Sequence, residues 1–180
     1  MSQDTIVQFV SFETTLDREE FITKWQEYTR SNNSDRNVTM QQSAKENGFR
    51  YLVQHRCATG GPGFVFEKGK RSSRTPEIGI TTKLAGGYSY LQSKRKNDIN
   101  ANECKVFAFL TSPSADLDVF RQLDANSQLN IYEAYYENCR YAYILEFFVK
   151  NKNAAELLDS LKKIDVAETG IYKECALQLL

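Results

Sequence analysis

Residues 141–149 read Tyr-Ala-Tyr-Ile-Leu-Glu-Phe-Phe-Val, and this stretch indicates the fold most clearly. In an extended strand, alternate side chains point to opposite faces. Apolar residues therefore occupy both faces, Tyr141, Tyr143, Leu145, Phe147 and Val149 on one and Ala142, Ile144 and Phe148 on the other. A sheet that is wet on one side alternates apolar with polar residues. This strand is therefore predicted to be covered on both sides.

The same pattern occurs in residues 104–110, where Val106, Ala108 and Leu110 oppose Phe107 and Phe109. Burying one such large side chain contributes roughly 1.5–3 kcal/mol. Five or more left in water would lose on the order of 10 kcal/mol, comparable with the net stability of a domain, about 5–15 kcal/mol. Helices can cover one face only, so the other face requires a second sheet, from the other half of the chain or from another subunit.

The second half of the chain has a regular order of elements. Strands are predicted at residues 104–110, 129–136, 141–149 and 171–177, with one helix following Pro113 and another at residues 154–164. This β-α-β-β-α-β order is that of the ferredoxin-like arrangement.

The first half begins in the same way. A strand is predicted at residues 5–12, and Asp17 is predicted to cap a helix with Phe21, Trp25 and Tyr28 on one face. A short helix at residues 39–46, strands at 49–57, 64–66 and 77–82, and a strand or loop at 84–91 follow. We therefore predict an α+β fold of two ferredoxin-like halves, residues 1–98 and 99–180, whose antiparallel sheets pack face to face as a barrel-like sandwich.

Composition excludes several classes of function. Lys and Arg number 23, as do Asp and Glu, so the net charge is zero and nothing favours binding to nucleic acid. The chain has no apolar stretch near the roughly 20 residues of a membrane helix and no signal peptide, which favours a cytoplasmic protein without membrane contact. Four dispersed cysteines and one histidine are poor material for a metal cluster and favour reduced thiols.

Residues 6–12, residues 17–25 and the element order of residues 104–178 together resemble the dimeric α+β barrel group. This group includes antibiotic-biosynthesis-type monooxygenases and haem-degrading proteins. The resemblance implies a pocket for a small hydrophobic or aromatic molecule, cofactor-independent or haem-linked oxygenation, and a possible homodimer. The alternative is a non-catalytic binding or self-association module.

His55 is the only histidine, and the only residue whose unperturbed pKa lies near neutrality. If its face of the strand lines a pocket, His55 can act as a general base or as an axial haem ligand, with Trp25 and Tyr51 shaping the pocket. Tyr132 and Tyr143 are further candidates for ligand contact, since their rings are apolar and their hydroxyls polar; the alternative is that they fill a sheet interface. Glu146, within an apolar strand, is predicted at a sheet edge or, alternatively, in a cavity with a raised pKa.

Overall fold

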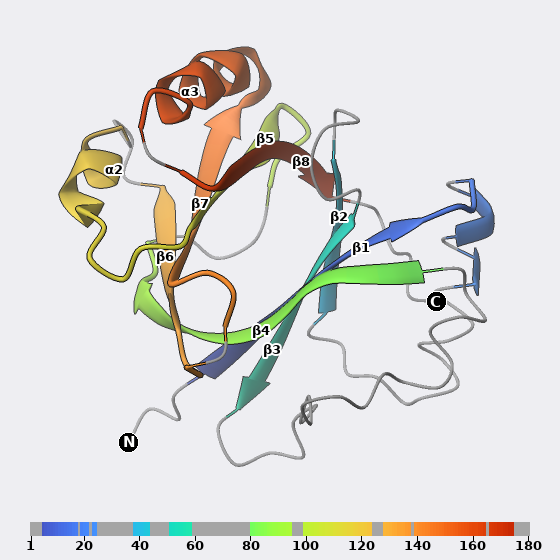
Figure 1. Ribbon diagram of the computed structural model, residues 1–180. Helices are drawn as coiled ribbons and strands as arrows, with labels where there is room; N and C mark the ends of the chain where they lie inside the picture. The colour runs from blue at the N-terminus through green and yellow to red at the C-terminus, as the bar shows by residue number, and fades with distance from the viewer. Residues whose placement is uncertain are drawn as a thin grey trace.

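A computed structural model describes residues 5–17, 19–21, 23–24, 38–43, 51–58, 80–94, 99–123, 128–137, 139–164 and 166–174. Eight antiparallel strands within these residues close into a barrel (Figure 1). They are β1 (Thr5–Thr14), β2 (Val38–Ser43), β3 (Tyr51–Ala58), β4 (Ile80–Gln92), β5 (Glu103–Leu110), β6 (Leu129–Ala134), β7 (Tyr143–Lys150) and β8 (Glu168–Glu174). The predicted α+β fold with two packed antiparallel sheets is confirmed.

The order of strands around the barrel is β1-β3-β2-β8-β5-β7-β6-β4, with β4 pairing back onto β1. Within the first four strands the order is β4-β1-β3-β2, and within the last four it is β8-β5-β7-β6. Both are the fourth-first-third-second order of a ferredoxin-like sheet. The two sheets also share hydrogen-bonded seams, β2 with β8 and β4 with β6. The second sheet that the apolar pattern requires is therefore supplied by the same chain.

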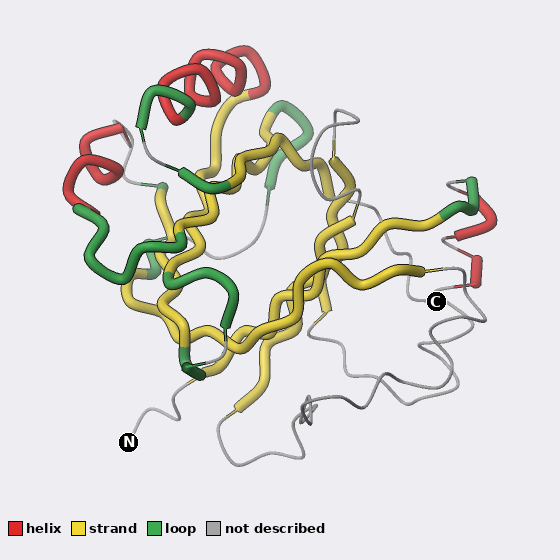
Figure 2. The backbone as a smooth tube through the Cα atoms, viewed as in Figure 1, coloured by secondary structure: helices red, strands yellow, loops and turns green. Residues whose placement is uncertain are grey.

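Two apolar clusters lie on opposite faces of the sheet, one inside and one outside the barrel. The interior cluster draws on seven strands and consists of Val7, Phe9, Leu52, Tyr88, Phe107, Phe109, Tyr132, Tyr141, Ile144 and Tyr172. The exterior cluster lies beneath α2 (Leu117–Leu123) and α3 (Ala154–Leu161). Both helices are labelled in Figure 1, and Figure 2 shows them in red outside the yellow strands. From β5 the exterior cluster includes Val106, Ala108 and Leu110. The double-sided apolar strands are thus explained, because one face meets helices and the other meets the barrel interior.

The predicted helix at residues 39–46 is wrong, since residues 38–43 form strand β2. β2 pairs with β3 on one side and β8 on the other. Its backbone hydrogen bonds are therefore satisfied by both sheets, and this tertiary pairing outweighs local helical preference.

The stretch at residues 84–91, which the sequence leaves open between strand and loop, belongs to the long strand β4. This strand contains glycines because aromatic rings lie close against its backbone, and not because the chain turns there. A Cβ atom built on Gly87 would lie 2.7 Å from the ring of Tyr136, so only glycine allows this ring to lie against the strand.

The predicted helix start at Asp17 is confirmed. The Asp17 carboxylate accepts a hydrogen bond of 2.9 Å from the backbone N–H of Glu20, and residues 19–21 and 23–24 are helical. The predicted strand at residues 64–66, Trp25 and Tyr28 lie outside the described residues. No helix among the described residues is both long enough and apolar enough to cross a bilayer.

Candidate functional site

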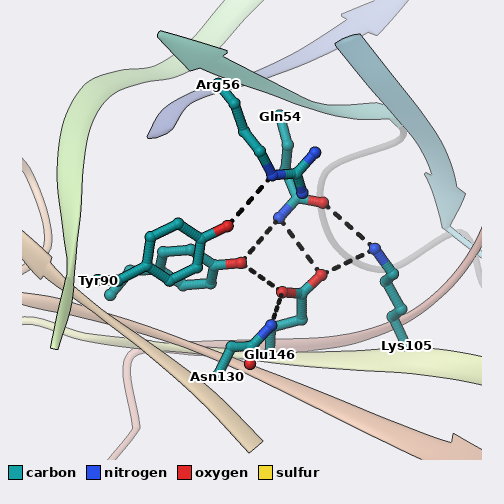
Figure 3. Close-up of polar contacts among 7 residues, drawn as sticks. Gln54, Arg56, Tyr90, Lys105, Asn130 and Glu146 are labelled. Carbon is teal, nitrogen blue, oxygen red and sulfur yellow. Dashed lines mark hydrogen bonds and ion pairs between the residues drawn. The ribbon is translucent and has the colours of Figure 1, made fainter. Parts of the chain in front are cut away.

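Five polar side chains meet inside the barrel, where apolar residues are the norm. Strand alternation places Lys105 on the same face of β5 as Phe107 and Phe109, both in the interior cluster. We use the name interior polar cluster for Gln54, Lys105, Asn130, Tyr132 and Glu146 (Figure 3). None of the five has any solvent exposure. Charged residues are almost never buried to this extent unless they are paired.

The centre of the cluster is an ion pair between neighbouring strands. The Nζ atom of Lys105 on β5 lies 2.8 Å from Oε1 of Glu146 on β7. The ammonium group also lies 5.2 Å from the centre of the Phe148 ring. A buried pair of this kind is stable only if hydrogen bonds satisfy the remaining donors and acceptors.

Those hydrogen bonds come from two further strands, β6 and β3. Oε2 of Glu146 accepts from the Tyr132 hydroxyl at 2.5 Å and from Nδ2 of Asn130 at 3.0 Å, both on β6. Across the barrel, Gln54 on β3 donates through Nε2 to Oε1 of Glu146 at 3.3 Å and accepts through Oε1 from Lys105 at 3.5 Å. The cluster therefore joins the two sheets through the interior.

The environment of Glu146 favours its charged form. Burial by itself would raise the pKa of this carboxyl, but the Lys105 ammonium and the hydrogen bonds from Lys105, Tyr132 and Asn130 outweigh it, so the pKa lies below its ordinary value. A carboxyl with a lowered folded-state pKa stabilises the fold above its ordinary pKa, and this contribution is lost as the pH falls through the lowered value. Burial and the neighbouring carboxylate hold the pKa of Tyr132 well above its ordinary value, so this phenol stays a neutral donor.

Two further polar residues, Arg56 and Tyr90, adjoin the interior polar cluster, and we call them the arm of the cluster. Nε of Arg56 on β3 donates to the hydroxyl of Tyr90 on β4 at 3.1 Å. The Tyr90 ring packs on the Tyr132 ring, with 4.8 Å between their centres. Both residues of this arm are half-buried, whereas the residues of the interior polar cluster have no exposure. Figure 3 shows the arm beside the cluster.

The ligand residues predicted from the sequence do not all share one side of the barrel. Tyr132 lies inside it, as part of the interior polar cluster. Tyr51 is buried on the outer face of β3, where its ring packs on Phe21 at 4.5 Å between centres. Tyr143 lies on the outer face of β7, and its hydroxyl donates to the backbone carbonyl of Pro113 at 3.0 Å.

The predicted catalytic residue, His55, lies in β3, where its backbone pairs with Gln8 and Val38. Strand alternation assigns position 55 to the same outer face as Tyr51 and Val53. Position 55 therefore shares a face of β3 with Tyr51, and this is the opposite face of the sheet from Tyr132. Trp25, predicted beside Tyr51, lies outside the described residues.

Both predictions for Glu146 are wrong: it is fully buried rather than at a sheet edge, and its pKa is lowered rather than raised. The reason is Lys105, which sequence reasoning missed as a partner. The available signal was that Lys105 and Glu146 are isolated charges of opposite sign in two strongly apolar strands. Adjacent pairing of β5 and β7 brings these positions together, with Glu146 opposite Phe107, two residues from Lys105.

The described part of the chain contains no group of three or more His, Cys, Asp or Glu side chains suited to a metal ion. Two cysteines described there, Cys104 and Cys139, are free thiols. Burial raises the pKa of Cys104, which keeps it protonated and poorly suited to metal binding.

No protein-family model matches the sequence, and no curated protein is significantly similar to it. Solved structures of chlorite dismutase from Candidatus Nitrospira defluvii are similar in fold. A site-directed variant has a TM-score of 0.56 at 8% identity, covering 98% of this chain and 93% of that chain. The complex with imidazole has a TM-score of 0.54 at 8% identity, and a variant in complex with cyanide has 0.52 at 9%, with the same coverage. The chain therefore has a chlorite dismutase-like α+β fold over almost its entire length.

Proposed function

We propose that the protein is a haem-binding α+β barrel protein that acts on a small hydrophobic or aromatic molecule. The observation that carries this proposal is the similarity of fold to chlorite dismutases, which are haem proteins, over nearly the full length of both chains. At 8–9% identity the similarity concerns the fold. The ligand must therefore be argued from this chain's own residues.

The outer face of β5–β8 is poorly suited to haem. It is filled by the exterior apolar cluster beneath α2 and α3. Haem iron is held in proteins by His, Cys thiolate, Met or Tyr. Cys104 lies in this cluster, but its raised pKa disfavours the thiolate. The barrel interior is equally unsuited, because the interior polar cluster and aromatic rings occupy it.

The outer face of β3 fits haem better. It contains position 55, with the only histidine of the chain, and it is the face on which the buried ring of Tyr51 packs on Phe21. We assign His55 as the residue that would hold the haem iron and Tyr51 as a residue that would pack against the macrocycle. When bound, haem would supply redox chemistry at its iron for oxygenation of the small molecule. The protein's part is to hold the iron through the imidazole and to exclude water with apolar side chains.

Titration with haemin is expected to give a Soret band shifted from that of free haemin and saturating at one haem per chain, because His55 ligates the iron. His55→Ala is expected to weaken binding by at least about tenfold and to alter the Soret position. Cys139→Ser, which removes a half-buried thiol, is the matched control and should leave the spectrum unchanged. Absorbance spectroscopy measures each titration.

His55→Gly with added imidazole separates ligation from folding, since free imidazole can replace the missing side chain. Recovery of the wild-type spectrum would support axial ligation by His55. Equal haem affinity and spectra for wild type and His55→Ala, or no saturable binding by wild type, would overturn the proposal. The second outcome would favour a protein that uses no haem.

We also propose that residues 1–98 and 99–180 are diverged copies of one module, which the equal strand orders of the two sheets support. The inner sheet faces already meet within one chain. A homodimer would therefore use outer surfaces, where Tyr135 and Tyr136 are about half exposed.

A further inference from the structure

Arg56 has a buried donor that no other described residue uses. Its Nη2 atom is inaccessible to solvent and has no hydrogen-bond partner within the described part of the chain, whereas Nε of the same guanidinium donates to Tyr90. Buried polar atoms without a partner are uncommon in folded proteins and call for an explanation. A ligand that accepts from Nη2 would provide one.

The charge of Arg56 is also uncompensated. Glu146 is the only carboxylate of the interior polar cluster, and its charge is balanced by Lys105 at 2.8 Å. None of the ion pairs formed between described residues includes Arg56. The arm formed by Arg56 and Tyr90 therefore carries one excess positive charge, which a single negative charge would neutralise.

The geometry of the arm selects the shape of that anion. Nε and Nη2 form one edge of the planar guanidinium, the edge that binds carboxylates side-on. The Tyr90 hydroxyl accepts the hydrogen from Nε. It also interacts with the Tyr132 hydroxyl, whose own proton is donated to Glu146. Packing on Tyr132 holds the Tyr90 ring in place. A planar anion would accept from Nη2–H through one oxygen, and through its other oxygen it would compete with the Tyr132 hydroxyl for the Tyr90 O–H.

We propose that Arg56 and Tyr90 form a binding site for a small monovalent carboxylate, which accepts hydrogen bonds from Nη2 of Arg56 and from the hydroxyl of Tyr90. This site is separate from the proposed haem site. Positions 55 and 56 are consecutive in β3, so they belong to opposite faces of the strand. Arg56 therefore shares its face of β3 with Gln54, whereas the proposed haem site is on the opposite face.

Isothermal titration calorimetry with acetate and benzoate, at ionic strength held constant with NaCl, tests this proposal on the full chain. Saturable binding of one carboxylate per chain is expected for wild type. Arg56→Gln should weaken it by at least about tenfold, because the charge and the fork of donors are lost. Tyr90→Phe, which removes one hydroxyl only, should weaken it by roughly threefold to tenfold. Sulfate, tetrahedral and divalent, should bind more weakly than acetate.

The proposal is overturned if wild type shows no saturable heat beyond that of chloride, if Arg56→Gln retains wild-type affinity, or if sulfate binds as tightly as acetate. Should Arg56→Gln not fold, NMR of wild type decides. Acetate is then expected to shift the Nε–Hε resonance of Arg56, assigned by its absence in Arg56→Lys, and an unmoved resonance would contradict the site. Tyr90→Phe is expected to bind haemin as wild type does, so the anion site and the haem site can fail independently.

Discussion

Lys105→Met is expected to lower the free energy of unfolding by about 3–5 kcal/mol, the cost of leaving a buried charge without its partner. The variant keeps a side chain of similar length but removes the ammonium that lies 2.8 Å from Glu146. The carboxylate then has only hydrogen bonds from Tyr132, Asn130 and Gln54 to offset its burial. Urea unfolding followed by circular dichroism measures the change. The pKa of Glu146 is expected to rise in this variant, because its largest stabilising charge is gone.

Lys150→Met is the matched control, since Lys150 ends β7 with an exposed side chain. Its effect should stay within about 0.5 kcal/mol. The double variant Lys105→Met/Glu146→Gln should be more stable than Lys105→Met alone, because the orphaned charge is removed while a hydrogen-bonding side chain remains. If Lys105→Met unfolds at the same urea concentration as Lys150→Met, Lys105 and Glu146 do not form a buried ion pair in the folded protein.

Phe9→Ala is expected to cost about 3–5 kcal/mol, as is usual when a buried phenylalanine is truncated. Phe9 lies in β1 with no solvent exposure, and its ring packs edge-on against three others inside the barrel. The ring centres lie 5.5 Å from Tyr88, 6.4 Å from Phe107 and 4.9 Å from Tyr132. These partners come from β4, β5 and β6, so truncation removes contacts between the two sheets. The free energy of unfolding in urea again provides the measurement.

Leu91→Ala serves as the comparison, because Leu91 in β4 is 46% exposed. Its cost should be about 0.5 kcal/mol or less. Equal costs for the two variants would show that Phe9 does not pack in a closed interior.

The sequence was sufficient to predict the second half of the fold. Its strands are apolar on both faces, and its helix at residues 154–161 presents Leu157, Leu158 and Leu161 to the exterior cluster. Such patterns depend on local periodicity, which a single sequence displays. The first half was harder because β2 is short and stabilised by pairing with β3 and β8. Pairing between distant segments leaves little local trace.

The candidate site was predicted only in part. Tyr132 was selected as a ligand contact for its chemistry, but its partners Lys105, Asn130 and Gln54 were not identified. Lys105 and Glu146 are separated by 41 positions, and only the register of β5 with β7 brings them together. The sequence marks His55 by its chemistry but gives no such mark to Arg56, which strand alternation assigns to the opposite face of β3. A sequence shows which residues are unusual, whereas strand register decides which of them meet.

Cross-strand nuclear Overhauser effects at the two seams between the sheets test the closed barrel most directly. The paired residues are Ser89 with Glu133 in β4–β6 and Gln42 with Lys173 in β2–β8. Opposed Cα atoms in antiparallel strands are about 4.5–5.5 Å apart, so backbone protons of both pairs are expected to give cross-peaks. Backbone amides that donate a hydrogen bond across either seam should also show slow hydrogen exchange with solvent. Cross-peaks confined to pairs within each sheet, with rapidly exchanging amides along β2 and β4, would contradict a closed barrel.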